Sequence, residues 1–141
     1  MPSLGGTLYV EGIVTLSLSG VEFVNSAGAA GGAVYIADNT LGVQIKDCIF
    51  SACTGNYGGA LYLAETVPHF QLFGSVFSNC FATSSGGAIF IDSGNSNGTI
   101  SNVSISVCST GGDGGALYIF QYNDDMSLTG VSITGCSSAF S

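Results

Sequence analysis

A six-residue motif recurs five times along the chain and limits the available folds more than any other feature. It consists of two glycines, a small residue, an aliphatic residue, an aromatic residue and a second aliphatic residue. Its copies begin at Gly5, Gly31, Gly58, Gly86 and Gly114, at intervals of 26, 27, 28 and 28 residues. A fixed period of this length is typical of repeat proteins, in which each repeat packs on its neighbours.

Further columns of similar residues keep the same period. One apolar column is Leu18, Ile45, Leu72, Ile100 and Leu128, and a second is Phe23, Phe50, Phe77, Ile105 and Ile133. Between them lies the column Gly20, Asp47, Gly74, Asn102 and Gly130. Gly, Asp and Asn are the residue types that best tolerate a left-handed backbone, so this column predicts a bend in every repeat.

Each repeat contains three short runs in which apolar residues alternate, separated by turns. Such runs predict strands and are too short for helices. We therefore expect an all-β fold, a right-handed parallel β-helix (β-solenoid) of about five coils of 26–28 residues with three short strands per coil. The right hand follows from the strong preference of parallel crossovers. Residues 1–141 would form a single domain, either a segment of a longer solenoid or a subunit that stacks head to tail.

Alternation within the repeated motif assigns the two faces of its strand. We place the aliphatic residues inside, together with the Leu18 and Phe23 columns. The aromatic residues then form an external ladder of Tyr9, Tyr35, Tyr62, Phe90 and Tyr118. The opposite assignment stays open, because both columns are apolar.

The composition excludes several classes of function. Charged residues are 7% of the chain, with one Lys or Arg against nine acids and a net charge of −8. Nucleic-acid binding is excluded because nothing can neutralise phosphates. Membrane insertion is not expected, because the longest apolar stretch is far shorter than the roughly 20 residues of a spanning helix. Few side chains could catalyse a reaction, so we expect no enzyme. His69 is interpreted as a surface residue and Lys46, beside Asp47, as part of a solvated pair.

Four cysteines share a column, Cys53, Cys80, Cys108 and Cys136, at the corner before each Gly-Gly pair. We interpret this ladder as small, buried packing residues. Disulfides between successive rungs remain an alternative, whereas the spacing does not favour a metal site. Cys48 belongs to another column and is the odd thiol.

Three weaker signals lie in loops and turns. Asn97 and Asn102 begin sequences that match the N-glycosylation pattern. The loop after the first strand gathers acids and asparagines, which could bind Ca²⁺ weakly without any dedicated cofactor: Asp38, Asn39, Glu65, Asp92, Asn95, Asn97, Asn123, Asp124 and Asp125. Asp124 and Asp125 could also mimic the carboxylate pair of a polysaccharide-cleaving enzyme.

The Gly-Gly-Ala-aliphatic-aromatic block, paired with a Phe-containing block, resembles the repeat of polymorphic outer-membrane proteins, typified by chlamydial autotransporter adhesins. The resemblance covers all five repeats. The family's second block ends in Asn, whereas the equivalent column here holds Ser26 and then four cysteines. The resemblance implies a parallel β-helix in a surface protein and no particular activity.

The function we expect is structural: a non-enzymatic, extracellular or cell-surface β-solenoid forming part of a fibre, appendage or adhesin stalk. Its partners would be copies of itself, stacked head to tail, or adjoining repeats of a longer chain. The alternative is a module that binds carbohydrate or a host surface through the external aromatic ladder. A polysaccharide-active enzyme ranks third.

Overall fold

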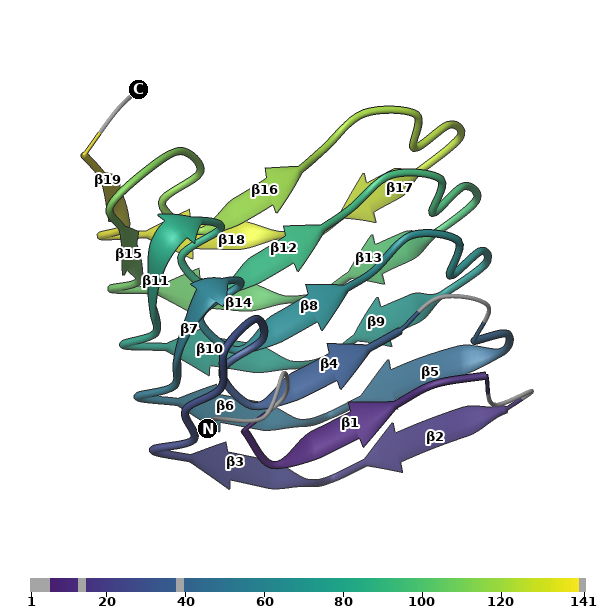
Figure 1. Cartoon of the computed structure of the whole chain (residues 1–141), viewed down its shortest axis with the longest axis horizontal. Coiled ribbons are helices and arrows are strands. Elements are labelled where there is room, and N and C mark those ends of the chain that lie inside the picture. Colours follow the sequence, from purple (N-terminus) through teal and green to yellow (C-terminus); the bar gives the residue numbers. More distant parts are fainter. Residues whose placement is uncertain (1–5, 13–14, 38–39, 140–141) are drawn as a thin grey trace.

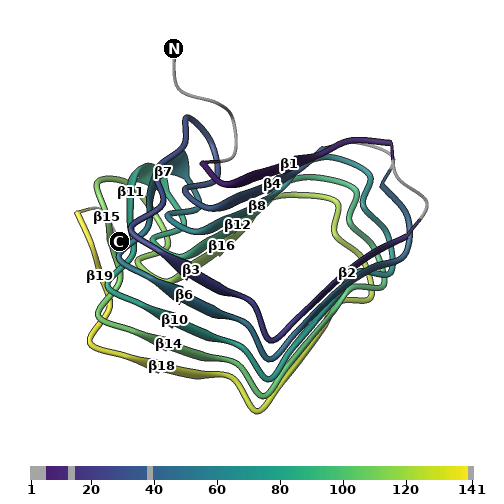
Figure 2. The ribbon, with the colours of Figure 1, turned by 90° about the horizontal axis from the view of Figure 1, so that it is seen from below.

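The computed structural model describes residues 6–12, 15–37 and 40–139, and within them the chain winds as a right-handed parallel β-solenoid of stacked coils (Figures 1 and 2). Gly5, Asp38 and Asn39, which carry sequence predictions, lie outside the described residues. The predicted all-β fold is confirmed. The described segments contain no helix, and therefore none that is long and apolar enough to cross a membrane.

Four parallel sheets run along the solenoid axis. The first sheet contains β1 (Leu8–Val10), β4 (Val34–Ile36), β8 (Leu61–Leu63), β12 (Ile89–Ile91) and β16 (Leu117–Ile119). The second contains β2 (Leu16–Ser19), β5 (Val43–Lys46), β9 (Gln71–Phe73), β13 (Thr99–Ser101) and β17 (Ser127–Thr129). The third contains β3 (Glu22–Val24), β6 (Ile49–Ser51), β10 (Val76–Ser78), β14 (Ser104–Ser106) and β18 (Ser132–Thr134). The fourth contains β7 (Thr54–Tyr57), β11 (Phe81–Ser85), β15 (Ser109–Thr110) and β19 (Ser137–Ser138).

The strands pair in the register that the repeat period requires. In the first sheet, Tyr35 of β4 lies between Tyr9 of β1 and Tyr62 of β8. In the third sheet, Phe50 of β6 lies between Phe23 and Phe77. Each strand therefore pairs with its counterpart one repeat away, so that equivalent residues lie in rows along the axis.

The prediction of three strands per coil was wrong, because coils also contain a short fourth strand. This strand follows the cysteine corner and precedes the Gly-Gly pair. Its buried inward residues are small or polar: Gly55 in β7, Ala82 in β11 and Thr110 in β15. A strand without an apolar alternation gives no period-two signal, so the sequence pattern indicated only a turn.

The aliphatic residues of the repeated motif face the core, as predicted. Val34, Leu61 and Ile89 are completely buried, and so are their partners two residues on, such as Ile36. The Phe23 column also points inward. The rings of Phe23 and Phe50 stack with centroids 4.8 Å apart, and those of Phe50 and Phe77 with centroids 4.5 Å apart. One continuous apolar core therefore runs along the solenoid axis.

The bend predicted between the second and third sheets is present in every coil. Gly20, Asp47, Gly74, Asn102 and Gly130 have φ of 65°, 52°, 64°, 52° and 63°. A second left-handed column, not predicted, lies at the next corner, where Asn25, Ala52, Asn79, Val107 and Gly135 have φ between 53° and 63°. Two left-handed corners in each coil turn the chain from the second sheet through the third to the fourth.

The two glycines of the repeated motif serve different purposes. Gly58 has φ of 69°, which favours glycine. Gly59 has no such φ, but a Cβ there would overlap the carbonyl oxygen of Gly87 in the next coil. The pair therefore combines a left-handed turn with a close approach between neighbouring coils.

Candidate functional site

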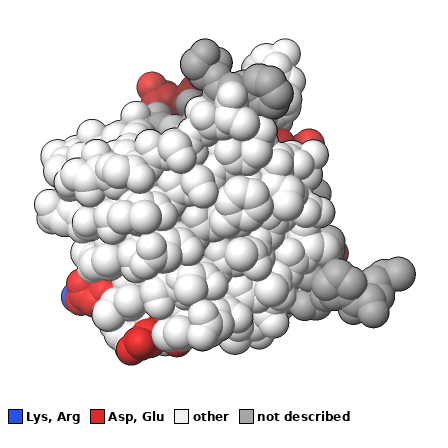
Figure 3. Space-filling view, turned by 90° about the vertical axis from the view of Figure 1, so that its left-hand side faces the viewer, with Lys and Arg blue, Asp and Glu red and all other residues white. Residues whose placement is uncertain are grey.

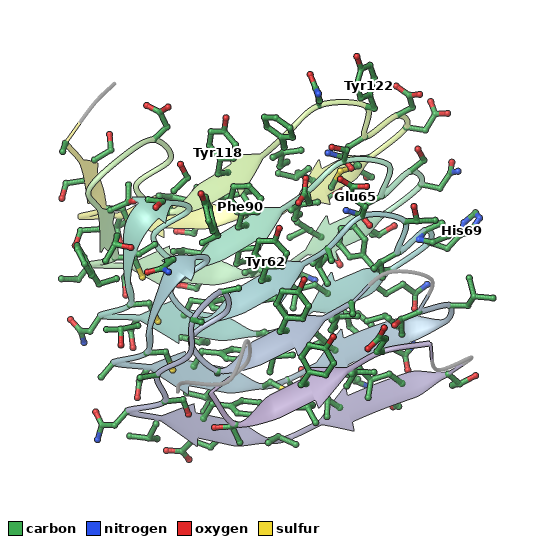
Figure 4. All side chains as sticks on the ribbon, in the orientation of Figure 1. Tyr62, Glu65, His69, Phe90, Tyr118 and Tyr122 are labelled. Atoms are coloured by element: carbon green, nitrogen blue, oxygen red, sulfur yellow. The ribbon has the colours of Figure 1, made fainter. Side chains whose placement is uncertain are left out.

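The predicted external aromatic ladder lies on the outer face of the first sheet, where Tyr62, Phe90 and Tyr118 follow one another along the axis (Figure 4). Successive rings from Tyr9 to Tyr118 have centroids 5.2, 4.9, 5.1 and 5.2 Å apart and interplanar angles between 3° and 12°. The faces of neighbouring rings therefore cover one another, and ring edges point outward. Binding of carbohydrate by this ladder stays a prediction, and a sugar that stacks on ring faces would find most of them occupied.

The ladder changes where phenylalanine replaces tyrosine. Phe90 carries no hydroxyl group, and the ring of Tyr57 from β7 lies against it, with centroids 5.1 Å apart and planes 65° apart. Tyr57 also contacts Tyr62 edge-on, at a centroid distance of 6.3 Å. Together with the stacked rings of Tyr62 and Tyr118, Tyr57 leaves only 6% of Phe90 exposed, although Phe90 is on the outer face.

Beside Tyr57, a hollow of about 420 Å³ opens over the ladder. Its lining is mainly aromatic, comprising Tyr57, Tyr62, Phe90, Tyr118 and Phe120, with Ser85 and Asp92. Phe120 lies near Tyr118, with centroids 6.3 Å apart. We call this the aromatic hollow. The repeated aromatic column predicts three of its rings, whereas Tyr57 and Phe120 lie outside that column and carry no such signal.

The carboxylate of Asp92 supplies the charge in the aromatic hollow. Its Oδ2 accepts a hydrogen bond of 2.6 Å from the Tyr62 hydroxyl. Its Oδ1 accepts from the backbone N–H and the hydroxyl of Ser93, at 2.8 and 3.2 Å. Burial, and then the hydrogen bond to Asp92, raise the pKa of Tyr62 above its usual value, so that Tyr62 stays a donor.

The cysteine ladder lies at the corner between the third and fourth sheets. Cys53, Cys80 and Cys108 are buried and Cys136 is partly buried. Their thiols donate to carbonyl oxygens, as Cys53 does to Ser51 at 3.5 Å and Cys80 does to Ser78 at 3.4 Å. All five cysteines, including the buried Cys48, are free thiols in the structure. These contacts agree with the packing interpretation.

The thiols of the ladder influence one another. The hydrogen bond with Cys80 lowers the pKa of Cys53 to about 7 and that of Cys108 to about 7, against the effect of burial. Those two hydrogen bonds and burial raise the pKa of Cys80. Burial also raises the pKa of Cys136. Because Cys53, Cys80 and Cys108 are buried, their thiols are not accessible to a substrate in the described structure.

The asparagines of the loop after the first sheet connect neighbouring coils. The buried Asn95 accepts a hydrogen bond from the Val67 N–H at 2.5 Å, and its own N–H donates to Asn123 Oδ1 at 2.7 Å. Its side-chain amide donates to the carbonyl of Asp92 at 2.9 Å. Among the described residues, no three His, Cys, Asp or Glu side chains lie close enough to hold a metal ion. Weak Ca²⁺ binding here stays a prediction.

The remaining candidate residues lie on the surface. Asn97 and Asn102 are exposed, and both have left-handed φ, 61° and 52°. Asp124 and Asp125 are exposed as well. Lys46 places its ammonium 5.7 Å from the centre of the Phe73 ring.

His69 is exposed at a left-handed turn, with φ of 59°, and borders a hollow of about 290 Å³ at the second sheet. That hollow is lined by Thr15, Leu16, Ser17, Gly42, Val43, Gln44 and Gln71 as well. The lining of this hollow contains no acid or thiol beside the imidazole.

Comparisons with family models, curated proteins and solved structures found no match to this chain. The resemblance to the repeats of polymorphic outer-membrane proteins therefore remains a hypothesis carried by the sequence motifs alone.

Proposed function

We propose that this protein is a non-enzymatic structural β-solenoid that forms part of an extracellular or cell-surface fibre, appendage or adhesin stalk by stacking coil on coil. One observation carries the proposal. The fifth coil presents core columns to solvent that are buried in the second, third and fourth coils. Leu128 and Ile133 are 44% and 49% exposed, whereas Ile100 and Ile105, one coil earlier, are each 1% exposed.

The backbone at this edge supports the same proposal. Strands β16, β17, β18 and β19 each stand at the end of their sheet and pair on one side only within the described residues (Figure 1). A shallow hollow of about 290 Å³ opens there, lined in part by Leu117, Ile133 and Cys136. Unpaired parallel strands above an apolar core would accept one more coil, which makes them a template for another solenoid segment.

The sides of the solenoid support an assembly role in a different way. The face over the fourth sheet and its corners carries no charged side chain across its centre, and acids gather at its margins (Figure 3). The outer positions of β14 and β18 are serines and threonine: Ser104, Ser106, Ser132 and Thr134. These two strands belong to the third sheet, whose outer positions in earlier coils include the exposed Val24, Ile49 and Val76. A face of small hydroxyl and apolar side chains with few charges suits lateral packing.

The test compares two variants on one strand, β18. Ile133→Lys adds a charge to the exposed core column, and Ser132→Lys adds the same charge to the outer face. The wild-type chain should form longer species as its concentration rises, measured by light scattering after size exclusion. Electron microscopy should show thin filaments with an axial repeat near 24 Å, about 4.8 Å for each coil.

Ile133→Lys should remain a folded monomer, and Ser132→Lys should assemble like the wild type. Stacking through this edge is wrong if the wild type stays monomeric at all concentrations, or if both variants assemble equally. A circular dichroism spectrum of each variant separates loss of assembly from loss of fold.

A further inference from the structure

We propose that the aromatic hollow binds a methylated ammonium group, as in choline or a related quaternary amine. The site lies on the outer face of the first sheet, so the proposal is independent of stacking at the fifth coil. It joins three observations: a lining of aromatic rings, one fixed carboxylate, and an absence of cationic side chains from that lining.

The shape of the hollow comes from three elements. The ladder rings of Tyr62, Phe90 and Tyr118 line it, Tyr57 from β7 packs edge-on against Tyr62 and Phe90, and Phe120, directly after β16, lies near Tyr118. Tyr57 and Phe120 are 42% and 43% exposed, so both rings are accessible. A volume of about 420 Å³ lies within the range of small-molecule sites, roughly 300–1,000 Å³.

The missing hydroxyl of Phe90 makes this place unlike the rest of the ladder. Tyr62 and Tyr118, the neighbouring rungs, each carry a phenol oxygen at the outer end of the ring, whereas Phe90 ends in carbon. The crossed ring of Tyr57, at 65° to Phe90 and 68° to Tyr62, interrupts the parallel stack. Here a ligand meets rings in more than one orientation, which a parallel ladder alone cannot offer.

The charge of the hollow favours a cation. Asp92 accepts three hydrogen bonds, all from neutral groups of Tyr62 and Ser93, so these contacts hold its carboxylate without cancelling its charge. The chain has a single Lys or Arg, which is Lys46 in β5 of the second sheet. A net charge of −8 further raises the local concentration of cations.

The chemistry of the lining selects the kind of cation. A divalent metal ion needs several oxygen ligands, and the hollow has one carboxylate. A methylated ammonium is large and weakly hydrated, and aromatic rings attract it electrostatically through their faces. The ladder rings cover one another's faces, so the exposed rings of Tyr57 and Phe120 would supply this contact. A neutral sugar would gain nothing from the charge of the Asp92 carboxylate.

Titration of the folded chain with choline, followed by calorimetry or by tyrosine fluorescence, tests this proposal. The matched control ligand is 3,3-dimethylbutanol, which has the shape of choline without the charge. Choline should bind about tenfold more tightly than the neutral analogue, because only choline is attracted by the ring faces and by the Asp92 carboxylate. Equal binding of both ligands, or binding of neither, overturns the proposal.

Two variants locate the site and a third serves as the control. Asp92→Asn keeps an acceptor for the Tyr62 hydroxyl and removes the charge, so it should weaken choline binding about tenfold and leave the neutral analogue unaffected. Tyr57→Ala should weaken the binding of both choline and 3,3-dimethylbutanol. Tyr122→Ala removes a ring that is 72% exposed and outside the hollow, and it should change neither.

A glycan array tests the alternative that the aromatic hollow binds carbohydrate. Binding of a neutral oligosaccharide that is lost in Tyr57→Ala but retained in Asp92→Asn would assign the hollow to sugars and overturn the cation proposal. Choline binding that survives Asp92→Asn and Tyr57→Ala unchanged would place the ligand elsewhere and would also overturn it.

Discussion

Val107 occupies a backbone conformation that its side chain disfavours. Its φ is 53°, in the left-handed region, and it stands in the corner column where Asn25 and Asn79 have φ of 56° and 54°. A β-branched residue fits this region poorly, whereas asparagine enters it readily. Val107 is also 60% exposed, so its side chain contributes little to the core.

Val107→Asn should therefore stabilise the protein, by about 1 kcal/mol, because it relieves this conformational cost. Urea unfolding followed by circular dichroism measures the change in the free energy of unfolding. Val76→Asn is the matched control, since Val76 is also an exposed valine but lies in the extended strand β10. That control should lose stability, by up to about 1 kcal/mol. A Val107→Asn protein no more stable than the wild type would contradict the expectation.

The two left-handed corners differ in how well their residue types predict the left-handed backbone. The first contains only glycine, aspartate and asparagine, so its conformation could be predicted. The second contains Ala52 and Val107, which do not indicate a left-handed backbone, and its column therefore gave no consistent signal. Hydrogen bonds between coils, such as Val107 N–H to Thr134 O at 3.0 Å and Ala52 N–H to Ser78 O at 3.0 Å, hold these residues there.

At the scale of the strand, inward and outward positions should respond very differently to the same change. Leu61 in β8 is completely buried, and Ser104 in β14 is exposed. Leu61→Asp would place an unpaired carboxylate in the core and should cost more than about 4 kcal/mol, enough to unfold the third coil. Ser104→Asp should change the stability by less than about 0.5 kcal/mol.

Thermal unfolding followed by circular dichroism compares the two variants directly. A second pair within one strand, Leu63→Asp and Tyr62→Asp, is less informative, because Tyr62 also packs in the aromatic ladder. Similar melting temperatures for Leu61→Asp and Ser104→Asp would refute the assignment of aliphatic residues to the core.

Strands with apolar alternation could be predicted, and the fourth strand could not. In β4, Val34 and Ile36 are buried on either side of the outward Tyr35, which is the pattern that identifies a half-buried strand. In β7, the inward residue is Gly55, and in β15 it is Thr110, so no apolar partner marks the inner face. Pairing with neighbouring coils, rather than local composition, makes these segments strands.

At the scale of the whole molecule, the repeat period predicted the ladder but not the aromatic hollow. Equivalent positions in a solenoid necessarily lie one above another, so Tyr62, Phe90 and Tyr118 could be placed together from spacing alone. Tyr57 and Phe120 enter the hollow because the fourth sheet folds back beside the first and because the chain turns after β16. Those directions depend on the three-dimensional path of the coil, which no column of the sequence records.

Charge should govern how readily whole solenoids stack. Glu11 and Glu22 are exposed in the first coil, Asp124 and Asp125 are exposed in the fifth, and the net charge is −8. If solenoids stack head to tail as proposed, acids of both ends would come together, so repulsion should oppose the apolar contact at low salt. Raising the salt from roughly 0.01 M to 1 M shortens the Debye length from about 30 Å to about 3 Å and should remove most of that repulsion.

We therefore expect association of the wild-type chain to strengthen steadily with salt, measured by sedimentation at a fixed protein concentration. Ile133→Lys should stay monomeric throughout, because its charge disrupts the apolar contact rather than the long-range repulsion. A neutral osmolyte at matched osmotic strength is the control for simple exclusion of solute from the protein surface. Association that weakens or stays constant as the salt concentration rises would contradict this prediction.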